Sequence, residues 1–205
     1  MENFFLTIGS VNFDFEKYFS LLNTGMLGRK LIFFESVTST NDVAKEYAEL
    51  EEWGLCLLSE EQTKGRGTHG RRWSTYKGQS IALSIILPPQ WVKDSAFLSI
   101  TAAKTIVKTL EKFNVHATIK YPNDVYLNGK KLAGILTETF YNGENLKYVI
   151  LGIGINLNQD EFNEELKDIA ISVKQTLGQG ISREQFLAAF LNDLVDVADF
   201  TFYQS

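Results

Sequence analysis

Two Asn-Gly pairs near the middle of this 205-residue chain constrain its fold more than any other feature. Asn128-Gly129 lies between the strand-like runs 125–127 and 132–140, and Asn142-Gly143 lies between the second run and residues 146–155. Asn-Gly between two such runs is the strongest short-range signal for a β-hairpin. Two hairpins in succession predict a three-stranded antiparallel meander, which argues against a doubly wound, all-parallel sheet.

The segments around the meander carry further strand and helix patterns. Apolar runs typical of buried strands occupy residues 31–34, 54–59 and 80–87. Apolar residues at helical spacing predict helices over residues 13–22, 95–113 and 183–203, the last capped by Ser182. Ser39 or Thr40 is a natural N-cap for another helix, which runs to about residue 50. The predicted fold class is therefore α+β, with a mixed, largely antiparallel sheet flanked by helices.

Composition and charge restrict the classes of function. With 44% hydrophobic residues, the chain can bury one domain-sized core, with or without a small appendage. The net charge of −5 provides no general basic surface for nucleic acid. No apolar stretch reaches membrane-spanning length, and the first residues lack the basic start of a secretory signal. Cys56, the single cysteine, lies in an apolar run, so we expect a buried thiol in a reducing compartment.

Residues 62–73 read QTKGRGTHGRRW and are rich in glycine and basic side chains. Glycine lets a backbone approach an anion closely, and arginine suits phosphate or carboxylate. Trp73 adds a flat face for a ring, so the segment indicates a loop over a nucleotide-like ligand; the alternative is a solvated basic loop. Its glycines match G-x-G-x-x-G, but no helix follows them, which argues against a dinucleotide fingerprint.

Few residues offer conventional catalytic chemistry. His69 and His116 are the only histidines, and the sequence contains neither a serine-nucleophile motif nor a metal-spaced Cys/His set. What remains is the placement of cations around a charged transition state, as in phosphoryl or nucleotidyl transfer. Lys120 is the leading cation because it ends a strand just before Pro122, although a solvated surface lysine would show the same pattern.

Several motifs in a fixed order resemble the catalytic domain of biotin–protein ligases. The match spans about residues 30–200, and the ordered set is far more specific than any single motif. The motifs are Ser39-Thr40-Asn41, Gln62 with Gly65-Arg66-Gly67 and Gly70-Arg71-Arg72-Trp73, Lys120-Tyr121-Pro122-Asn123-Asp124, Lys131-Leu132-Ala133-Gly134-Ile135-Leu136 and Gly152-Ile153-Gly154-Ile155-Asn156. The resemblance implies the class II aminoacyl-tRNA synthetase/biotin synthetase fold, with residues 1–205 as a single catalytic domain. Residues 1–29 would be a leader packed on that domain, and the small C-terminal β-barrel domain of the family would be absent.

The activity implied by this resemblance has two steps. Biotin and ATP are the substrates, with Mg²⁺ as cofactor, and they form biotinyl-5′-AMP and pyrophosphate; a lysine of a biotin carboxyl carrier domain then takes the biotin. A cytoplasmic enzyme is implied, without a nucleic-acid or membrane partner and with a homodimer left open. Two alternatives remain: a lipoate–protein ligase, which shares the fold, and a non-catalytic biotin-binding module.

The same resemblance implies roles for individual residues. The implied catalytic residues are Lys120 and Arg66. The implied biotin-binding residues are Ser39, Thr40, Asn41, Gln62, Arg66, Gly67, Thr68, Lys120 and Gly134. The implied nucleotide-binding residues are Arg71, Arg72, Trp73, Asn123, Lys131, Gly154 and Asn156, and no residue is assigned to a metal. Two positions depart from the family pattern, because Thr68 replaces an arginine that helps to hold the adenylate and Tyr121 replaces a tryptophan.

Overall fold

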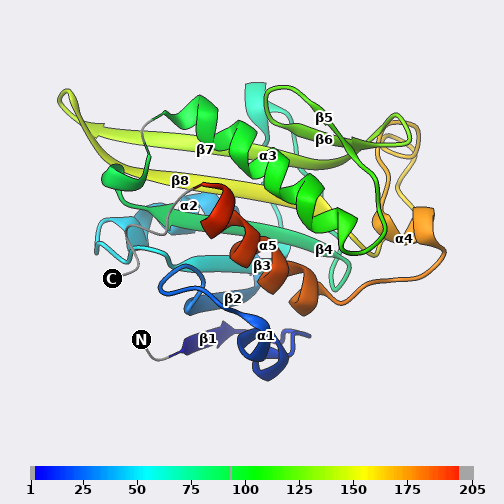
Figure 1. Ribbon diagram of the computed structural model, residues 1–205, viewed down its shortest axis with the longest axis horizontal. Coiled ribbons are helices and arrows are strands. Elements are labelled where there is room, and N and C mark those ends of the chain that lie inside the picture. The colour runs from blue at the N-terminus through cyan, green and yellow to red at the C-terminus, as the bar shows by residue number, and fades with distance from the viewer. Residues whose placement is uncertain (1–2, 93, 199–205) are drawn as a thin grey trace.

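One eight-stranded sheet forms the centre of the protein (Figure 1). The computed structural model describes residues 3–92 and 94–198. Across the sheet the strands follow the order β1-β2-β3-β4-β8-β7-β6-β5. Their bounds are β1 (Phe4–Ile8), β2 (Lys30–Val37), β3 (Cys56–Gln62), β4 (Ser80–Leu87), β5 (Thr118–Lys120), β6 (Asp124–Leu127), β7 (Lys130–Asn142) and β8 (Asn145–Asn156).

Parallel and antiparallel pairs are mixed in this sheet. β1 pairs with β2 and β2 with β3 in parallel, whereas the other neighbouring strands pair antiparallel. The parallel pairs are joined by helical crossovers, with α1 (Phe15–Leu21) between β1 and β2 and α2 (Thr40–Ala48) between β2 and β3. The predicted mixed, largely antiparallel sheet flanked by helices is confirmed.

The two central hairpins are confirmed, with one turn displaced. β6 and β7 flank Asn128-Gly129, where φ is 50° and 77°, the positive values that a type I′ turn requires. β7 and β8 instead flank Gly143-Glu144, one residue beyond the predicted Asn142-Gly143. Asn142 still pairs with Asn145 in the ladder, so the glycine, with φ of 61°, takes the first turn position.

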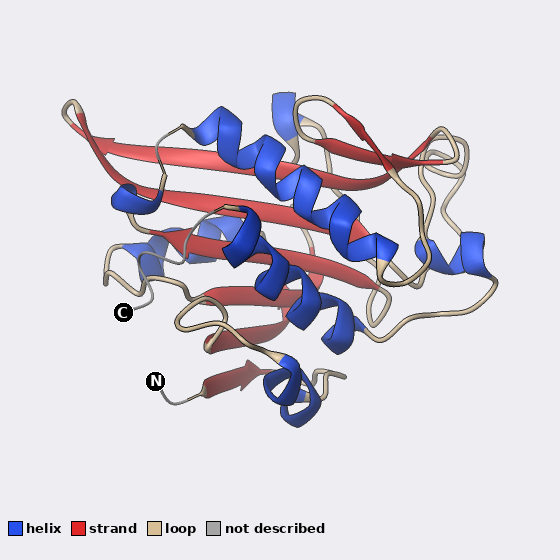
Figure 2. Cartoon of the chain, in the orientation of Figure 1, coloured by secondary structure: helices blue, strands red, loops and turns tan. Residues whose placement is uncertain are grey.

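Helices cover both faces of the sheet, as Figures 1 and 2 show. α3 (Ser95–Glu111) and α5 (Arg183–Val197) lie together across one face, and α2 lies on the other. The other helical segments described are the short α4 (Val173–Leu177) and single 3₁₀ turns at Thr68–Gly70 and Pro89–Trp91. Ser182 caps α5 by accepting a hydrogen bond from the Gln185 backbone, as predicted. The predicted end of this helix, at residues 199–203, lies outside the described residues.

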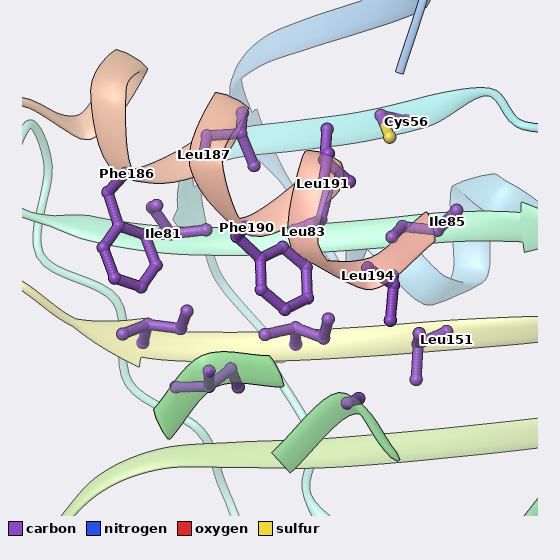
Figure 3. Packing of buried hydrophobic residues seen from close by; sticks show 14 of the residues in the cluster. Cys56, Ile81, Leu83, Ile85, Leu151, Phe186, Leu187, Phe190, Leu191 and Leu194 are labelled. Atoms are coloured by element: carbon purple, nitrogen blue, oxygen red, sulfur yellow. The ribbon is translucent and has the colours of Figure 1, made fainter. Parts of the chain in front are cut away.

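The larger hydrophobic core lies between the sheet and the helices α3 and α5. Figure 3 shows Ile81, Leu83 and Ile85 of β4 in this core with Leu151 of β8 and with Phe186, Leu187, Phe190, Leu191 and Leu194 of α5. A smaller core lies under α2 and contains Phe34, Ala44, Ile86 and Ile150. Cys56 is fully buried in the larger core, as predicted, and burial raises the pKa of its thiol well above the usual value.

The N-terminal segment adds a parallel edge strand that the sequence patterns do not predict. Phe4–Ile8 pairs with β2, and Phe5 stacks on Phe15 of α1 at a ring-centroid distance of 4.3 Å. Tyr18 of α1 is buried and donates a hydrogen bond to the carbonyl of Gly28 at 3.0 Å. None of the helices in residues 3–92 and 94–198 is long and apolar enough to cross a membrane.

Candidate functional site

A pocket opens on the α2 face of the sheet, where β8 carries glycine in place of large side chains. Tyr148 and Ile150 fill this face beside α2, and Gly152 and Gly154 occupy the next two positions on the same face. The cavity encloses about 450 Å³, including open space at its mouth. We call it the central pocket, and its walls come from α2, β4, β7, β8 and the loop at residues 62–73.

One end of the central pocket is a network of buried polar groups. Asn41 donates from Nδ2 to Glu138 (2.7 Å) and accepts at Oδ1 from the Ser84 hydroxyl (2.5 Å). The side-chain carbonyl of Gln62 accepts from the backbone N–H (2.8 Å) and the hydroxyl (3.1 Å) of Thr40. These groups stand on α2 and on strands, so their geometry is set by regular secondary structure.

Gly152 and Gly154 are required by the side chains that lie against them. A Cβ at position 152 would lie 2.4 Å from Oδ1 of Asn41, and a Cβ at position 154 would lie 2.2 Å from Cε2 of Trp73. Both distances are shorter than any normal carbon contact. The two glycines therefore give room to the side chains of the pocket itself.

Trp73 borders both the central pocket and a second cavity. Its indole covers Gly154, and its Nε1 is buried without a hydrogen-bond partner among the described residues. Lys131 Nζ lies 5.8 Å from the centre of the indole and 2.7 Å from the carboxylate of Asp124. A buried indole N–H normally finds an acceptor, so this donor is an unsatisfied polar group in the pocket wall.

The second cavity, which we call the loop-side cavity, combines basic and apolar walls. It encloses about 910 Å³, including open space, and shares Trp73 and Lys131 with the central pocket. Its basic and polar walls include Arg71, Arg72 and Asn156, and its apolar walls include Phe162, Leu166 and Ile169. The sequence patterns do not identify the apolar wall, because its residues are scattered among acidic ones and belong to no helix or strand.

Arg66 is held at the central pocket by an ion pair with Asp42 of α2. Its two terminal nitrogens each lie 2.6 Å from a carboxylate oxygen of Asp42, and Glu138 lies 3.9 Å away. The hydrogen bonds from Arg66 hold the pKa of the Asp42 carboxyl below its usual value, and the same contact raises the pKa of the guanidinium. Both groups therefore remain charged at neutral pH.

The loop that carries Arg66 is closed by its own hydrogen bonds. Gly67 N donates to the carbonyl of Arg71 (2.7 Å), and Trp73 N donates to the carbonyl of Gly65 (2.9 Å). Arg71 also donates from Nη2 to the Thr68 hydroxyl at 3.0 Å. A guanidinium therefore lies beside the position at which the family pattern has an arginine.

Lys120 lies outside both cavities. Its ammonium is 3.4 Å from the hydroxyl and 4.8 Å from the ring centre of Tyr126. It lines a third, neighbouring space, the hairpin-side cavity, together with Tyr121 and Thr137. Lys131 lines the central pocket and the loop-side cavity, so it is the lysine that stands where these two spaces meet.

Most residues predicted for the site surround these cavities. The central pocket is lined by Ser39, Thr40, Asn41, Gln62, Arg66, Gly67, Thr68, Trp73, Asn123, Lys131, Gly134 and Gly154. The loop-side cavity adds Arg71, Arg72 and Asn156, whereas His116 is exposed elsewhere.

The sequence patterns do not identify three features of the site, namely Ser84, Glu138 and the pairing of Asp42. A serine or an acid in a strand or helix gives no sequence signal that identifies its distant partner. Within the described part of the chain, no group of three His, Cys, Asp or Glu side chains is arranged to hold a metal ion.

Comparison with known proteins identifies the family. The model of the biotin/lipoate A/B protein ligase family matches residues 33–156, and the chain belongs to this family. It is 39% identical over 167 residues to the bifunctional ligase/repressor BirA of Bacillus spizizenii, covering 79% of this chain and 51% of that protein. It is 33% identical over 155 residues to the biotin–[acetyl-CoA-carboxylase] ligase of Paracoccus denitrificans, covering 73% of this chain and 65% of that protein.

A solved structure agrees with this assignment. The biotin protein ligase from Aquifex aeolicus in complex with biotin and ATP matches with a TM-score of 0.72 and 31% identity, covering 83% of this chain and 70% of that chain. The predicted resemblance to biotin–protein ligases and the predicted catalytic fold are confirmed. The chain spans about half the length of the BirA relatives that it matches.

Proposed function

We propose that this chain is an ATP-dependent ligase that activates biotin as biotinyl-5′-AMP and transfers it to a lysine of a biotin carboxyl carrier domain. The observation that carries the proposal is the polar and cationic lining of the central pocket. It combines the hydrogen-bonding groups of Thr40, Asn41 and Gln62 with two cations, Arg66 and Lys131. Arg66 lies beside α2, the helix that carries Asn41, and Lys131 lies beside Gly134. Biotin offers matching groups, a neutral ureido ring that bonds polar side chains and a carboxylate that binds a cation.

The buried polar end suits the ureido ring. Ser39, Thr40, Asn41 and Gln62 supply donors and acceptors close to a floor that lacks side chains at Gly152. A site built to bond polar groups rejects an analogue that lacks them, because the donors and acceptors that are not already bonded within the protein would be left unpaired. The dithiolane ring of lipoate has no N–H or carbonyl, so this end of the pocket favours biotin over lipoate.

The loop-side cavity suits the nucleotide. Arg71 and Arg72 provide charge for phosphates, and the Phe162–Ile169 wall with Trp73 provides apolar surface for a base. Gln159 donates to Oδ1 of Asn156 at 2.9 Å, which leaves the Asn156 amide N–H groups for a ribose or phosphate. Mg²⁺ is proposed to arrive with ATP, since it is bound largely through phosphates with one or two carboxylates, and Asp124 is a carboxylate of the pocket wall.

The chemistry follows from the placement of cations. A biotin carboxylate oxygen attacks the α-phosphorus of ATP, a new P–O bond forms, and pyrophosphate leaves with the electrons of the broken bond. Arg66 and Lys131 would stabilise the charge that develops between the carboxylate and the α-phosphate. The carrier lysine, as its neutral amine, then attacks the acyl carbon, AMP leaves with the electrons of the broken C–O bond, and the nitrogen releases a proton to solvent as the amide forms. The hairpin-side cavity, which shares Thr68, Asn123 and Asp124 with the central pocket, provides a route for that lysine.

Pyrophosphate release tests the proposal. The protein is incubated with ATP and Mg²⁺ and with biotin, lipoate or neither. Release that depends on biotin supports a biotin ligase, release that depends on lipoate would indicate the lipoate–protein ligase, and biotin binding without release would indicate a non-catalytic module. Mass spectrometry of a carrier domain then checks that one biotinyl group is transferred to its lysine.

The remaining proposals concern location and assembly. We propose a cytoplasmic location, which the buried free thiol of Cys56 supports, and a single catalytic domain on which residues 1–29 pack. The pairing of β1 with β2 supports this role of the N-terminal segment. Neither a nucleic acid nor a membrane is proposed as a partner. Light scattering of the purified protein decides between a monomer and a homodimer.

A further inference from the structure

Asp42 joins the glycine-rich loop to the helix that carries the polar end of the central pocket. It stands in the first turn of α2, directly after Asn41. Both of its carboxylate oxygens accept hydrogen bonds at 2.6 Å from the two terminal nitrogens of Arg66. Such a bidentate contact fixes the plane of a guanidinium as well as its position.

The carboxylate of Asp42 is itself held in place. Lys45, one turn further along α2, lies 3.2 Å from Asp42 and 3.4 Å from Glu138 of β7. Glu138 also accepts the hydrogen bond from Asn41 at 2.7 Å. Asp42 is therefore a fixed anchor between a helix and a strand, and the side chain of Arg66, which comes from a loop, is oriented against it.

The ion pair leaves Arg66 able to bind a ligand. A guanidinium has five N–H donors, and an end-on contact through its two terminal nitrogens uses two of them. One N–H on each terminal nitrogen and the Nε–H remain for an anion in the pocket. An anionic ligand can therefore bind to Arg66 without displacing Asp42.

We propose that Asp42 is a positioning residue that holds Arg66 at the central pocket in the orientation needed to bind the acyl-adenylate. The proposal rests on the proposed function, in which Arg66 meets the charge between the biotin carboxylate and the α-phosphate. An arginine side chain without this anchor would have to be ordered when the ligand binds, and the lost rotamer freedom would weaken binding on the order of tenfold.

If the role of Asp42 were purely structural, its substitution would give a different experimental result. An acid in the first turn of a helix interacts favourably with the positive end of the helix dipole. If that were its role, removing the charge would lower the stability of the fold without acting through Arg66. Glu49, at the other end of α2, forms an ion pair with Lys147 that does not line the pocket, and Glu49→Gln is therefore a matched control.

A double-mutant cycle tests the proposal. Binding of biotinyl-5′-AMP is measured by isothermal titration for the unchanged protein, Asp42→Asn, Arg66→Met and the double variant, and each thermal unfolding curve is recorded. We expect Asp42→Asn to weaken binding about tenfold when Arg66 is present and to have no further effect in the Arg66→Met background. Asp42→Glu should restore most of the affinity, and Glu49→Gln should bind like the unchanged protein.

Three results would overturn the inference: equal weakening by Asp42→Asn in both backgrounds, unchanged binding, or tighter binding. Tighter binding would mean that Asp42 competes with the ligand for Arg66. Pyrophosphate release by the unchanged protein distinguishes failure of the proposed function from failure of the positioning role of Asp42. If the unchanged protein neither binds the adenylate nor releases pyrophosphate, the proposed function fails and the inference fails with it. If it does both while Asp42→Asn behaves identically, the inference alone fails.

Discussion

Leu151 and Gly152 are consecutive residues of β8, yet they lie on opposite faces of the sheet. Leu151 is fully buried in the core under α3 and α5, and Gly152 forms part of the floor of the central pocket. The same contrast recurs on β4, where Ile85 packs in that core while the neighbouring Ser84 bonds to Asn41. Large side chains stabilise the covered face, and small ones leave room on the pocket face.

Substitutions on the two faces of the sheet should therefore change different properties of the protein. Side chains alternate along a strand, so odd and even positions of β4 and β8 belong to different environments. A change on the covered face should lower the free energy of unfolding and spare the site. A change on the pocket face should weaken binding or catalysis and largely spare the fold.

The largest effect on folding is expected from Glu60→Gln, a polar position on the covered face. Glu60 and Arg183 are buried and lie 2.8 Å apart at their closest atoms. Breaking such a pair leaves Arg183 as an uncompensated buried charge, and we expect a loss of about 4 kcal/mol in the free energy of unfolding by urea denaturation at pH 7. Glu161→Gln, at an exposed position, is the control and should change little.

The same pair predicts an acid dependence. Burial would raise the pKa of the Glu60 carboxyl, but the hydrogen bonds from Arg183 bring it below its usual value. A lowered pKa in the folded state means that the stabilisation is complete above the unfolded pKa of about 4.3 and is lost as the pH falls through the folded value. The difference between the unchanged protein and Glu60→Gln should therefore shrink below about pH 4. A difference that stays constant down to pH 3 would contradict this assignment.

Leu151→Ala should come next in size. Removing a fully buried leucine costs the transfer free energy of the side chain and leaves a cavity, together about 2–5 kcal/mol. Because the side chain points away from the pocket, we expect the affinity for biotin, measured by titration below the unfolding temperature, to remain unchanged. Weakened biotin binding in the folded variant would show that side chains on the covered face also affect the pocket.

Lys131→Ala should raise the activation free energy of adenylate formation by about 3 kcal/mol, which slows the reaction by roughly two orders of magnitude. Lys131 stands where the central pocket and the loop-side cavity meet, whereas Lys120 lines the hairpin-side cavity. Lys120→Ala is therefore the informative comparison, measured by the same pyrophosphate assay. A larger loss from Lys120→Ala would favour the sequence-based prediction that Lys120 is the leading cation.

Gly152→Ala should weaken biotin binding by about 2 kcal/mol, because the added Cβ would lie 2.4 Å from Asn41 and force its side chain to move. ATP binding should be unaffected, since Asn41 does not line the loop-side cavity. Titration with each ligand separately provides the measurement. Equal losses for biotin and ATP would show that the substitution distorts the whole sheet.

Thr68→Arg should have the smallest effect. A charge-assisted contact is worth roughly 1.5–3 kcal/mol, so an arginine here should slow the dissociation of biotinyl-5′-AMP about tenfold or more. Arg71 already donates to the Thr68 hydroxyl, so we expect its guanidinium to supply part of this charge in the unchanged protein. Dissociation is followed together with biotin labelling of a bystander protein. Equal rates and equal labelling would show that Arg71 fully replaces the missing arginine.

The features that could be predicted from the sequence have local signals. Asn128-Gly129 specifies its own turn, and Ser182 caps α5 through the backbone of a residue three positions away. The edge strand Phe4–Ile8 could not be predicted, because all five of its residues are exposed and show no burial pattern. The second hairpin turn is displaced by one residue because its position depends on the register of the long β7–β8 ladder.

The features of the site that could not be predicted depend on distant partners. Ser84 bonds to a residue 43 positions away, and Asn41 bonds to Glu138 across 97 positions. From the sequence, Asp42 is only an acidic residue that stabilises the first turn of a helix. Its partner Arg66 lies in a loop, and the fold brings the two side chains together. The contacts of Asn41 with Ser84 and Glu138 exist because β4 lies beside β8 and β8 beside β7.

The α+β class, the paired hairpins, the glycine-rich loop and the motifs of the family follow from the sequence, because turn chemistry and side-chain periodicity act between neighbours along the chain. Which of these residues share a pocket depends on the tertiary fold. Strand order and register placed Gly152 under Asn41 and Gly154 under Trp73, and they put Lys131 where the two cavities meet while Lys120 lines another. Such contacts join segments that are far apart in the chain, so no local pattern records them.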